Sequence, residues 1–204
     1  EMQRSLVGSE MCIRDSMWIG TSTGLYLLEK ATGKYTYIQM PVESYYIYSL
    51  CQASDGMLYI GTNNAGLLVY DTTKNTFRHY HRDNCALISN NIYTLLSDGK
   101  GNIFLSTEHG LSTFYPVEET FHNWTKEQGL KSDHFNAASG TLRKNGNFIF
   151  GSTDGAIEFN KDMILPRDYK FKMVFSDLRV FYQTVYPKDE GSPCLLYTSD
   201  AADE

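Results

Sequence analysis

The chain has 204 residues, of which 42% are hydrophobic and 14% aromatic, and its net charge is −6. This length allows one sizeable domain or a domain and a half, and the 15 Tyr and 11 Phe favour a β-rich core. The sequence has no run of 18 apolar residues and no apolar signal-peptide core, which excludes a membrane-spanning helix within it. Targeting segments of a secreted or membrane-tethered parent are therefore expected outside this chain.

The two ends, residues 1–16 and 194–204, do not follow the pattern between them and resemble translated adapter or assembly scars. We leave them out of the fold prediction. They carry −4 of the net charge, so the body is at −2, which indicates neither a basic nor an acidic partner, and no nucleic acid is expected. Cys51 and Cys85 remain in the body. Two cysteines make no disulfide framework and fit no metal spacing, and Cys51 is predicted to pack within a strand.

A five-residue segment recurs four times, with apolar residues first, a small residue in fourth place and a hydroxyl in fifth. Its copies are residues 17–21, 58–62, 103–107 and 148–152. Their fourth positions are 41, 45 and 45 residues apart. After each copy, a short polar turn ends in Gly and opens a second apolar run, at residues 25–28, 67–70, 111–114 and 156–159. A regular repeat of this length indicates an array of similar structural units.

Two more short strands complete each unit. An apolar run precedes the repeated segment and ends in a turn rich in Gly. These turns are Asp55-Gly56, Asp98-Gly99 and Asn145-Gly146. Such pairs supply the positive φ angles of two-residue hairpins, which we therefore predict. After the second apolar run, large aromatic residues alternate, which predicts a strand with one buried face. These aromatic strands are residues 35–37, 77–80 and 121–124.

Each unit thus has four short antiparallel strands, and four strands at a period of about 40 residues are typical of a β-propeller blade. A solenoid of strand plus helix would need a 3.6-residue periodicity in each unit, which the sequence lacks. We predict an all-β chain. Residues 17–165 form a partial β-propeller with two full and two partial blades. Residues 166–193 start a C-terminal β-sandwich, with strands at 171–175 and 178–182.

The partial blades lie at the two ends of the predicted array. The first lacks its first strand, because the scar replaces it, and the last lacks its fourth, which leaves 14 strands in all. A closed propeller needs at least four blades. We therefore expect an open arc that exposes, at both ends, a sheet face rich in Tyr, Phe, Leu and Ile. Such an arc is not expected to fold stably alone, and an upstream segment of the parent is expected to close the ring.

The repeat resembles the two-component regulator propeller family, whose units read apolar-Trp-Ile-Gly-Thr, then Gly-Leu, then an aromatic-Asp pair. The matching residues are 18–21, 24–26, 59–62, 66–67 and 70–71. The third copy departs from this pattern, with Ser106 in place of Gly and Thr113-Phe114 in place of the aromatic-Asp pair. The last copy resembles the closing repeat of such sensors, although Lys161 stands where Pro is usual.

This resemblance implies the extracytoplasmic sensor region of a bacterial hybrid two-component regulator, located in the periplasm as part of an inner-membrane protein. It implies an oligosaccharide or another small ligand. It also implies a transmembrane helix and a histidine kinase after the sandwich, outside this chain. The implied partners are the remaining blades, the sandwich and the kinase of the same chain, with a homodimer of the parent as a further option. The chain itself is expected to be no enzyme and to need no cofactor.

Strands alternate in direction within a blade. The turns between second and third strands therefore share one face of the propeller with the connections between blades, and we call this the loop face. Binding residues concentrate on such loops, and aromatic rings and amides suit the recognition of sugars. Asn also favours turns for backbone reasons, so a structural role stays open for each candidate. The candidates are Tyr45, Tyr46, Asn90, Asn91, His134 and Asn136 on connections, and Asn63, Asn64, Glu108 and His109 on turns.

Two other functions stay open. An enzyme on a propeller scaffold would need converging acid–base residues, and only Glu108, His109 and His134 could serve on the loop face. A protein-docking propeller would show a large exposed aromatic patch, whereas a funnel of mixed aromatic and amide residues would favour a small ligand.

Other notable residues have plainer explanations. His79 and His81 point the same way on a predicted strand but lack a third metal ligand. Trp18 and Trp124 lie within repeat strands, where core packing is expected. The adjacent Glu118-Glu119 pair lies on a turn, where the two side chains diverge and are solvated rather than catalytic.

Overall fold

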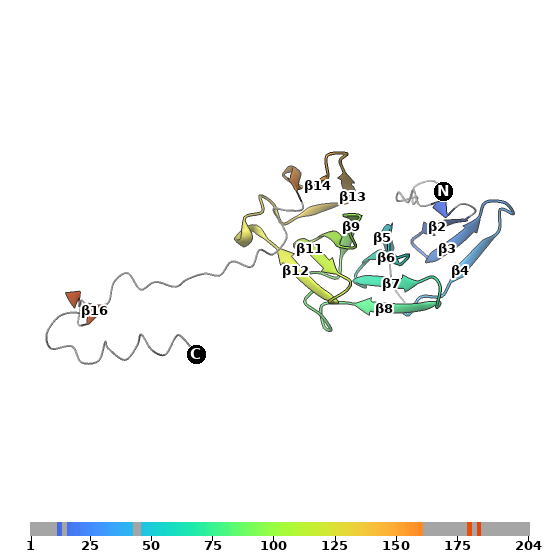
Figure 1. Ribbon diagram of the computed structural model, residues 1–204, viewed down its shortest axis with the longest axis horizontal. Helices are drawn as coiled ribbons and strands as arrows, with labels where there is room; N and C mark the ends of the chain where they lie inside the picture. Colours follow the sequence, from blue (N-terminus) through green and yellow to red (C-terminus); the bar gives the residue numbers. More distant parts are fainter. Residues whose placement is uncertain (1–11, 14–15, 43–45, 161–178, 181–182, 185–204) are drawn as a thin grey trace. The chain divides into compact units, whose positions relative to one another are not determined.

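The computed structural model describes residues 12–13, 16–42, 46–160, 179–180 and 183–184 (Figure 1). The regular structure of this part is strand apart from one 3₁₀ turn, η2 (Lys126–Gln128). Chain contacts group residues 1–166 into one compact unit and residues 167–204 into a second. The first unit consists of antiparallel sheets built like propeller blades, which confirms the predicted all-β class.

Four sheets follow one another in sequence order, and we call them blades 1 to 4 (Figure 1). Blade 1 has β1 (Cys12–Ile13), β2 (Ser16–Gly20), β3 (Leu25–Glu29) and β4 (Tyr35–Ile38). Blade 2 has β5 (Tyr46–Gln52), β6 (Leu58–Asn63), β7 (Leu67–Asp71) and β8 (Thr76–Tyr80). Blade 3 has β9 (Ile92–Ser97), β10 (Ile103–Thr107), β11 (Gly110–Tyr115) and β12 (Thr120–Trp124). Blade 4 has β13 (Phe135–Leu142), β14 (Asn147–Ser152) and β15 (Gly155–Asn160).

The prediction that blade 1 lacks its first strand is wrong. Cys12 pairs with Met17 and Ile13 with Ser16, so two residues of the excluded segment 1–16 form β1 beside β2. An extended neighbour satisfies backbone N–H and C=O groups that an open edge of β2 would leave unpaired. The described part of the chain thus has 15 blade strands rather than 14. The foreign origin of residues 1–16 and 194–204 stays a prediction.

Hydrophobic clusters join each blade to the next, because alternate residues of a strand face opposite neighbours. In β6, Leu58 and Ile60 belong to the cluster shared with blade 1, where Trp18 also packs. Tyr59 belongs to the cluster shared with blade 3, where its ring meets Phe114 edge-on at 6.2 Å. A third cluster joins blade 3 to blade 4. The continuous apolar runs of the repeat therefore reflect strands that are buried on both faces.

The small residue and the hydroxyl of the repeat have separate structural roles. A Cβ on Gly61 would lie 2.8 Å from Cγ2 of Ile92, so the missing side chain lets the first strand of blade 3 approach. The hydroxyl that follows donates to the carbonyl of the Gly that opens the third strand, at 2.7 to 2.9 Å in all four blades. The four donors are Thr21, Thr62, Thr107 and Ser152.

The predicted two-residue hairpins are wrong, because the loops between first and second strands are longer. In blade 2, Ala53 pairs with Met57 across three loop residues, with its N–H at 3.2 Å from the Met57 carbonyl. The N–H of Gly56 donates to the Ala53 carbonyl at 3.1 Å, and Gly56 alone in this loop has a positive φ, of 79°. A two-residue type I′ turn needs positive φ at both central residues, whereas this turn confines the strain to Gly.

The outward face of blade 1, on β4, exposes 68% of Tyr35 and 44% of Tyr37. The prediction that strand 35–37 has a buried aromatic face is therefore wrong. The separate expectation that this end of the arc exposes an apolar face agrees with these two tyrosines. The corresponding Phe77 of β8 stacks on Tyr70 at 4.4 Å, because blade 1 covers that side of blade 2. Among the described residues, no sheet covers β4 in this way.

At blade 4, the expectation of an outward face rich in Tyr, Phe, Leu and Ile is wrong. Glu158 of β15 pairs with Ile149 of β14 on this face. The Glu158 carboxylate accepts a hydrogen bond from Asn147 at 2.9 Å and lies 3.5 Å from Arg143. The aromatic residues Phe148, Phe150 and Phe159 instead face blade 3.

In the second unit, β16 (Arg179–Val180) lies within the predicted strand 178–182 and pairs with β17 (Gln183–Thr184), which lies just after that range. The other predicted strand, residues 171–175, lies outside the described residues. The predicted β-sandwich therefore stays a prediction. In the described part of the chain, no helix has the length and apolar character to cross a membrane.

Candidate functional site

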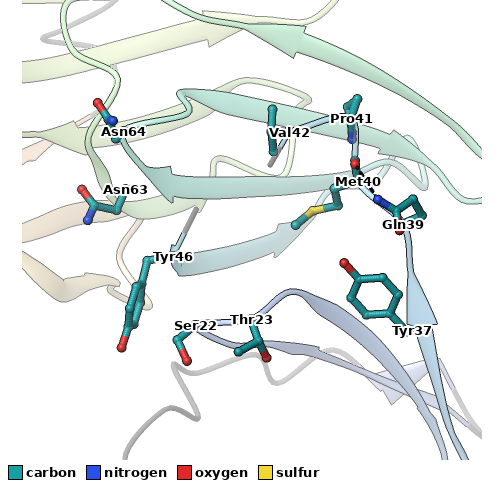
Figure 2. Close-up of a pocket in the computed structure, with 10 residues that line it drawn as sticks. All are labelled: Ser22, Thr23, Tyr37, Gln39, Met40, Pro41, Val42, Tyr46, Asn63 and Asn64. Carbon is teal, nitrogen blue, oxygen red and sulfur yellow. Dashed lines mark hydrogen bonds between the residues drawn. The ribbon is translucent and has the colours of Figure 1, made fainter. Parts of the chain in front are cut away.

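The loop face carries a pocket of about 860 Å³ between blades 1 and 2 (Figure 2). The turn between β2 and β3, the end of β4 and the connection that follows it supply the blade 1 side. The start of β5 and the turn after β6 supply the blade 2 side. Its lining residues are Ser22, Thr23, Tyr37, Gln39, Met40, Pro41, Val42, Tyr46, Asn63 and Asn64.

The lining combines exposed aromatic rings with uncharged hydrogen-bonding groups. Tyr46 is 49% exposed and Tyr37 is 44% exposed, so both rings are accessible to a ligand. Figure 2 shows these rings on opposite sides of Ser22 and Thr23. The side-chain amide of Gln39 donates to the neighbouring Met40 carbonyl at 3.5 Å and keeps its own carbonyl for other partners. Ring faces beside amides and hydroxyls are what a polyhydroxylated ligand requires.

Strand pairing brings the blade 2 residues of the pocket together. Tyr46 opens β5 and pairs with Asn63 at the end of β6, which places both at the loop face. The next residue, Asn64, has a left-handed backbone with φ of 68°, which Asn adopts more readily than most residues. Its backbone N–H donates to Oδ1 of Asn91 at 2.7 Å. The side chain of Asn64 is therefore presented from a turn that blade 3 holds in place.

A polar network continues from this turn across blades 3 and 4. The side-chain amide of Asn91 donates to Oε2 of Glu108 at 2.6 Å. Nδ1 of His134 lies 3.0 Å from the Glu108 carbonyl oxygen. The His134 and His109 rings are 6.5 Å apart and meet edge-on. Four predicted candidates thus gather in one network, joined to the pocket by Asn64.

Two further candidates among the described residues, Asn90 and Asn136, join neither group. Asn90 serves the backbone: its carbonyl accepts from the N–H of Gly66 at 2.9 Å and its Oδ1 from the N–H of Arg82 at 2.8 Å. Asn136 donates to the Ser152 carbonyl at 3.1 Å. Tyr45 lies outside the described residues. The pocket therefore contains three of the ten candidates, Tyr46, Asn63 and Asn64.

Sequence reasoning missed the blade 1 side of the pocket. Tyr37 was expected to be a buried residue of an aromatic strand, and the connection at 39–42 was not considered. The available signal was the position of Tyr37 near the end of its strand, two residues before a connection on the loop face. Ser22 and Thr23 could have been found from their place in the turn of the first repeat, which corresponds to Asn63 and Asn64 in the second.

His79 of β8 and His81, which follows the end of this strand, have ordinary partners. Nε2 of His79 lies 2.6 Å from the Ala65 carbonyl, and Nδ1 of His81 lies 3.4 Å from the Asp83 carboxylate. Among the residues that the structure describes, no three His, Cys, Asp or Glu side chains gather in a metal-binding group. Glu119 pairs with Arg78 of the neighbouring blade rather than with Glu118.

The tryptophan and cysteine predictions concern the blade cores. Trp18 is 4% exposed and meets Tyr70 edge-on at 5.7 Å, so its predicted core role is confirmed. Trp124 is half-buried and packs against the cluster between blades 3 and 4. Cys51 packs against the cluster between blades 2 and 3, and burial raises the pKa of its thiol to about 11. A thiol with a raised pKa is protonated at neutral pH and unreactive, which fits a packing role.

The two-component regulator propeller family matches residues 41–64, which include one side of the pocket, β5 and β6. Histidine kinase P4 of Formosa agariphila is 22% identical over 182 residues, which are 84% of this chain and 13% of that protein. The chain thus spans about an eighth of this curated relative.

Two solved structures of the BT4673 extracellular domain from B. thetaiotaomicron resemble this chain. In one, the protein is described as a putative one component system; the TM-score is 0.58 and the identity 22%, over 74% of this chain and 20% of that chain. In the other, the protein is described as a putative hybrid two component system. The TM-score is 0.60 and the identity 19%, over 74% of this chain and 21% of that chain. At these identities the likeness shows the fold.

Proposed function

Because the chain carries a repeat of the two-component regulator propeller family, we propose that it is a ligand-sensing part of a regulator's extracytoplasmic region. In this proposal the pocket on the loop face binds an oligosaccharide. Binding is signalled to a histidine kinase that lies beyond this chain. The proposed location is the periplasm, within an inner-membrane protein whose further blades and sandwich complete the sensor.

The pocket between blades 1 and 2 carries this proposal. Its two accessible tyrosine rings stand beside Asn63, Asn64 and the hydroxyls of one turn, rather than in a uniform aromatic patch. The mixture favours a small polyhydroxylated ligand over a protein partner, which would need a broader apolar surface. The regulatory role has separate support, since similar proteins are a histidine kinase and the extracellular domains of regulators.

Calorimetric titration of the complete sensor region that contains this chain, with a panel of oligosaccharides, tests the proposal. We expect at least one member to bind, and Tyr46→Ala and Asn63→Ala to weaken that binding by about fivefold or more, since each removes one ligand contact. Val117→Ala is the matched control, because Val117 is 92% exposed on a hairpin outside the pocket and its truncation should leave affinity unchanged. Binding that survives both pocket substitutions, or binding to no member of the panel, contradicts the proposal.

A further inference from the structure

We propose that the oligosaccharide bound in this pocket is neutral, without uronate, sulfate or phosphate groups. This inference rests on the proposed function and narrows its ligand class. The ten described lining residues include no Asp, Glu, Lys, Arg or His. Their polar groups are amides and hydroxyls, from Asn, Gln, Ser, Thr and Tyr side chains.

An anionic sugar would lose solvation in such a pocket without gaining a charged partner. Protein sites for carboxylate, sulfate or phosphate groups typically use Arg or Lys, whose charge-assisted hydrogen bonds are about twice as strong as neutral ones. Burying an anion without a cation or several such donors is costly. Neutral sugar hydroxyls, in contrast, can form hydrogen bonds with side-chain amides and hydroxyls, which both donate and accept.

Hydrogen bonds connect the Asn64 side of the pocket to a negatively charged carboxylate, that of Glu108. The N–H of Asn64 donates to Asn91, whose amide donates in turn to the carboxylate of Glu108. Two hydrogen bonds therefore separate the Asn64 backbone from an acidic group. An anionic unit bound beside Asn64 would have a like charge two hydrogen bonds away and no cation among the described lining residues, whereas a neutral unit needs no charged partner.

The size and ring arrangement favour more than one sugar unit. The cavity of about 860 Å³ lies in the upper part of the range of roughly 300–1,000 Å³ typical of ligand pockets. Tyr46 and Tyr37 lie on opposite sides of the Ser22–Thr23 turn in Figure 2, and each is partly exposed beside a second tyrosine, Tyr48 and Tyr26 respectively. A chain of neutral sugars can place one apolar ring face on each of Tyr46 and Tyr37.

Calorimetry on the complete sensor region that contains this chain, with tetrasaccharides of matched length, tests the inference. The neutral probes are cellotetraose, xylotetraose, mannotetraose and arabinotetraose; the anionic probes are tetragalacturonate and a heparin-derived tetrasaccharide. We expect the best neutral probe to bind at least about tenfold more tightly than either anionic probe. Its Kd should change by less than about twofold between about 20 and 500 mM NaCl, because no charge is screened.

Matched variants locate the binding. Tyr37→Ala should weaken the affinity for the best neutral probe by about fivefold or more, and Tyr35→Ala should weaken it by less than about twofold. Both tyrosines are exposed on β4, but only Tyr37 lines the pocket. Asn64→Gly keeps the left-handed turn and removes only the side chain, so it should also weaken binding. Thr23→Lys introduces a cation at an exposed position and should narrow the preference for neutral probes.

The outcomes separate the two proposals. Tighter or equal binding of an anionic probe, lost in Tyr37→Ala, would overturn the neutral-ligand inference while the sensing proposal stands. Binding of no probe, neutral or anionic, would overturn the sensing proposal and the inference with it. A neutral probe whose affinity is equally reduced by Tyr35→Ala and Tyr37→Ala would place the site elsewhere and also overturn the inference.

Discussion

Gly66→Ala should destabilise the chain more than the same change at Gly56, although the two glycines have nearly the same backbone conformation. Their φ angles are 76° and 79°. A left-handed residue with a Cβ costs roughly 1–2 kcal/mol, and both variants incur this cost. A Cβ on Gly66 would also lie 2.2 Å from the Tyr80 carbonyl oxygen, whereas nothing lies within 4 Å of a Cβ on Gly56.

The difference between the variants measures how closely β7 approaches β8. Relief of the clash requires a backbone shift, and such overpacking typically costs about 1–3 kcal/mol. Thermal unfolding of the complete sensor region, followed by circular dichroism, should show this as a lower Tm for Gly66→Ala than for Gly56→Ala. Equal Tm values for Gly66→Ala and Gly56→Ala would refute the reasoning, because only the close contact distinguishes them.

Three further results are expected. The pKa of Asp71 is lowered, first by the backbone N–H of Lys74, so its carboxylate contributes stability that is fully present above the unfolded pKa of about 3.9. The Tm advantage over Asp71→Ala should shrink below that value and be lost once pH falls below the lower folded-state pKa, and a constant gap in pH-dependent melting would contradict this. Thr62→Val should cost about 1–3 kcal/mol in urea unfolding, since it leaves the buried Gly66 carbonyl without its hydroxyl donor, while Thr76→Val on an exposed position should cost almost nothing. Chromatography after long incubation with the bound oligosaccharide should show no cleavage product, and steady turnover would overturn the assignment as a sensor.

The blade repeat was predictable because its local chemistry is the same in every copy. The hydroxyl of Thr62 and the glycine at position 66 act within one hairpin, so their spacing is visible in the sequence. Burial on both faces of β6 also follows from its unbroken apolar run. The length of the loop at Gly56 was not visible, because Asp-Gly suits both a two-residue turn and a three-residue loop with Gly in the left-handed position.

The pocket was only partly predictable, because it depends on which blade covers which strand. The strands β4 and β8 hold corresponding places in their blades. Only Phe77 of β8 has a neighbouring blade over it in the described residues, whereas Tyr37 of β4 is 44% exposed. Asn90 and Asn91 are adjacent in sequence, yet Asn90 satisfies local backbone groups while Asn91 reaches two other turns. Periodicity reports the conformation of a strand or turn and carries no information about such partners.

The pocket lies at a seam, since its lining comes from the end of one blade and the start of the next. Its residues lie outside the hydrophobic clusters that join the blades, apart from Met40 and the flanking Val42. Duplication of a blade in evolution would create a new seam with each copy, while the same close-packed contacts would be reused. Ligand preference could then diverge from seam to seam through changes in a few loop residues, without any change to the interior on which folding depends.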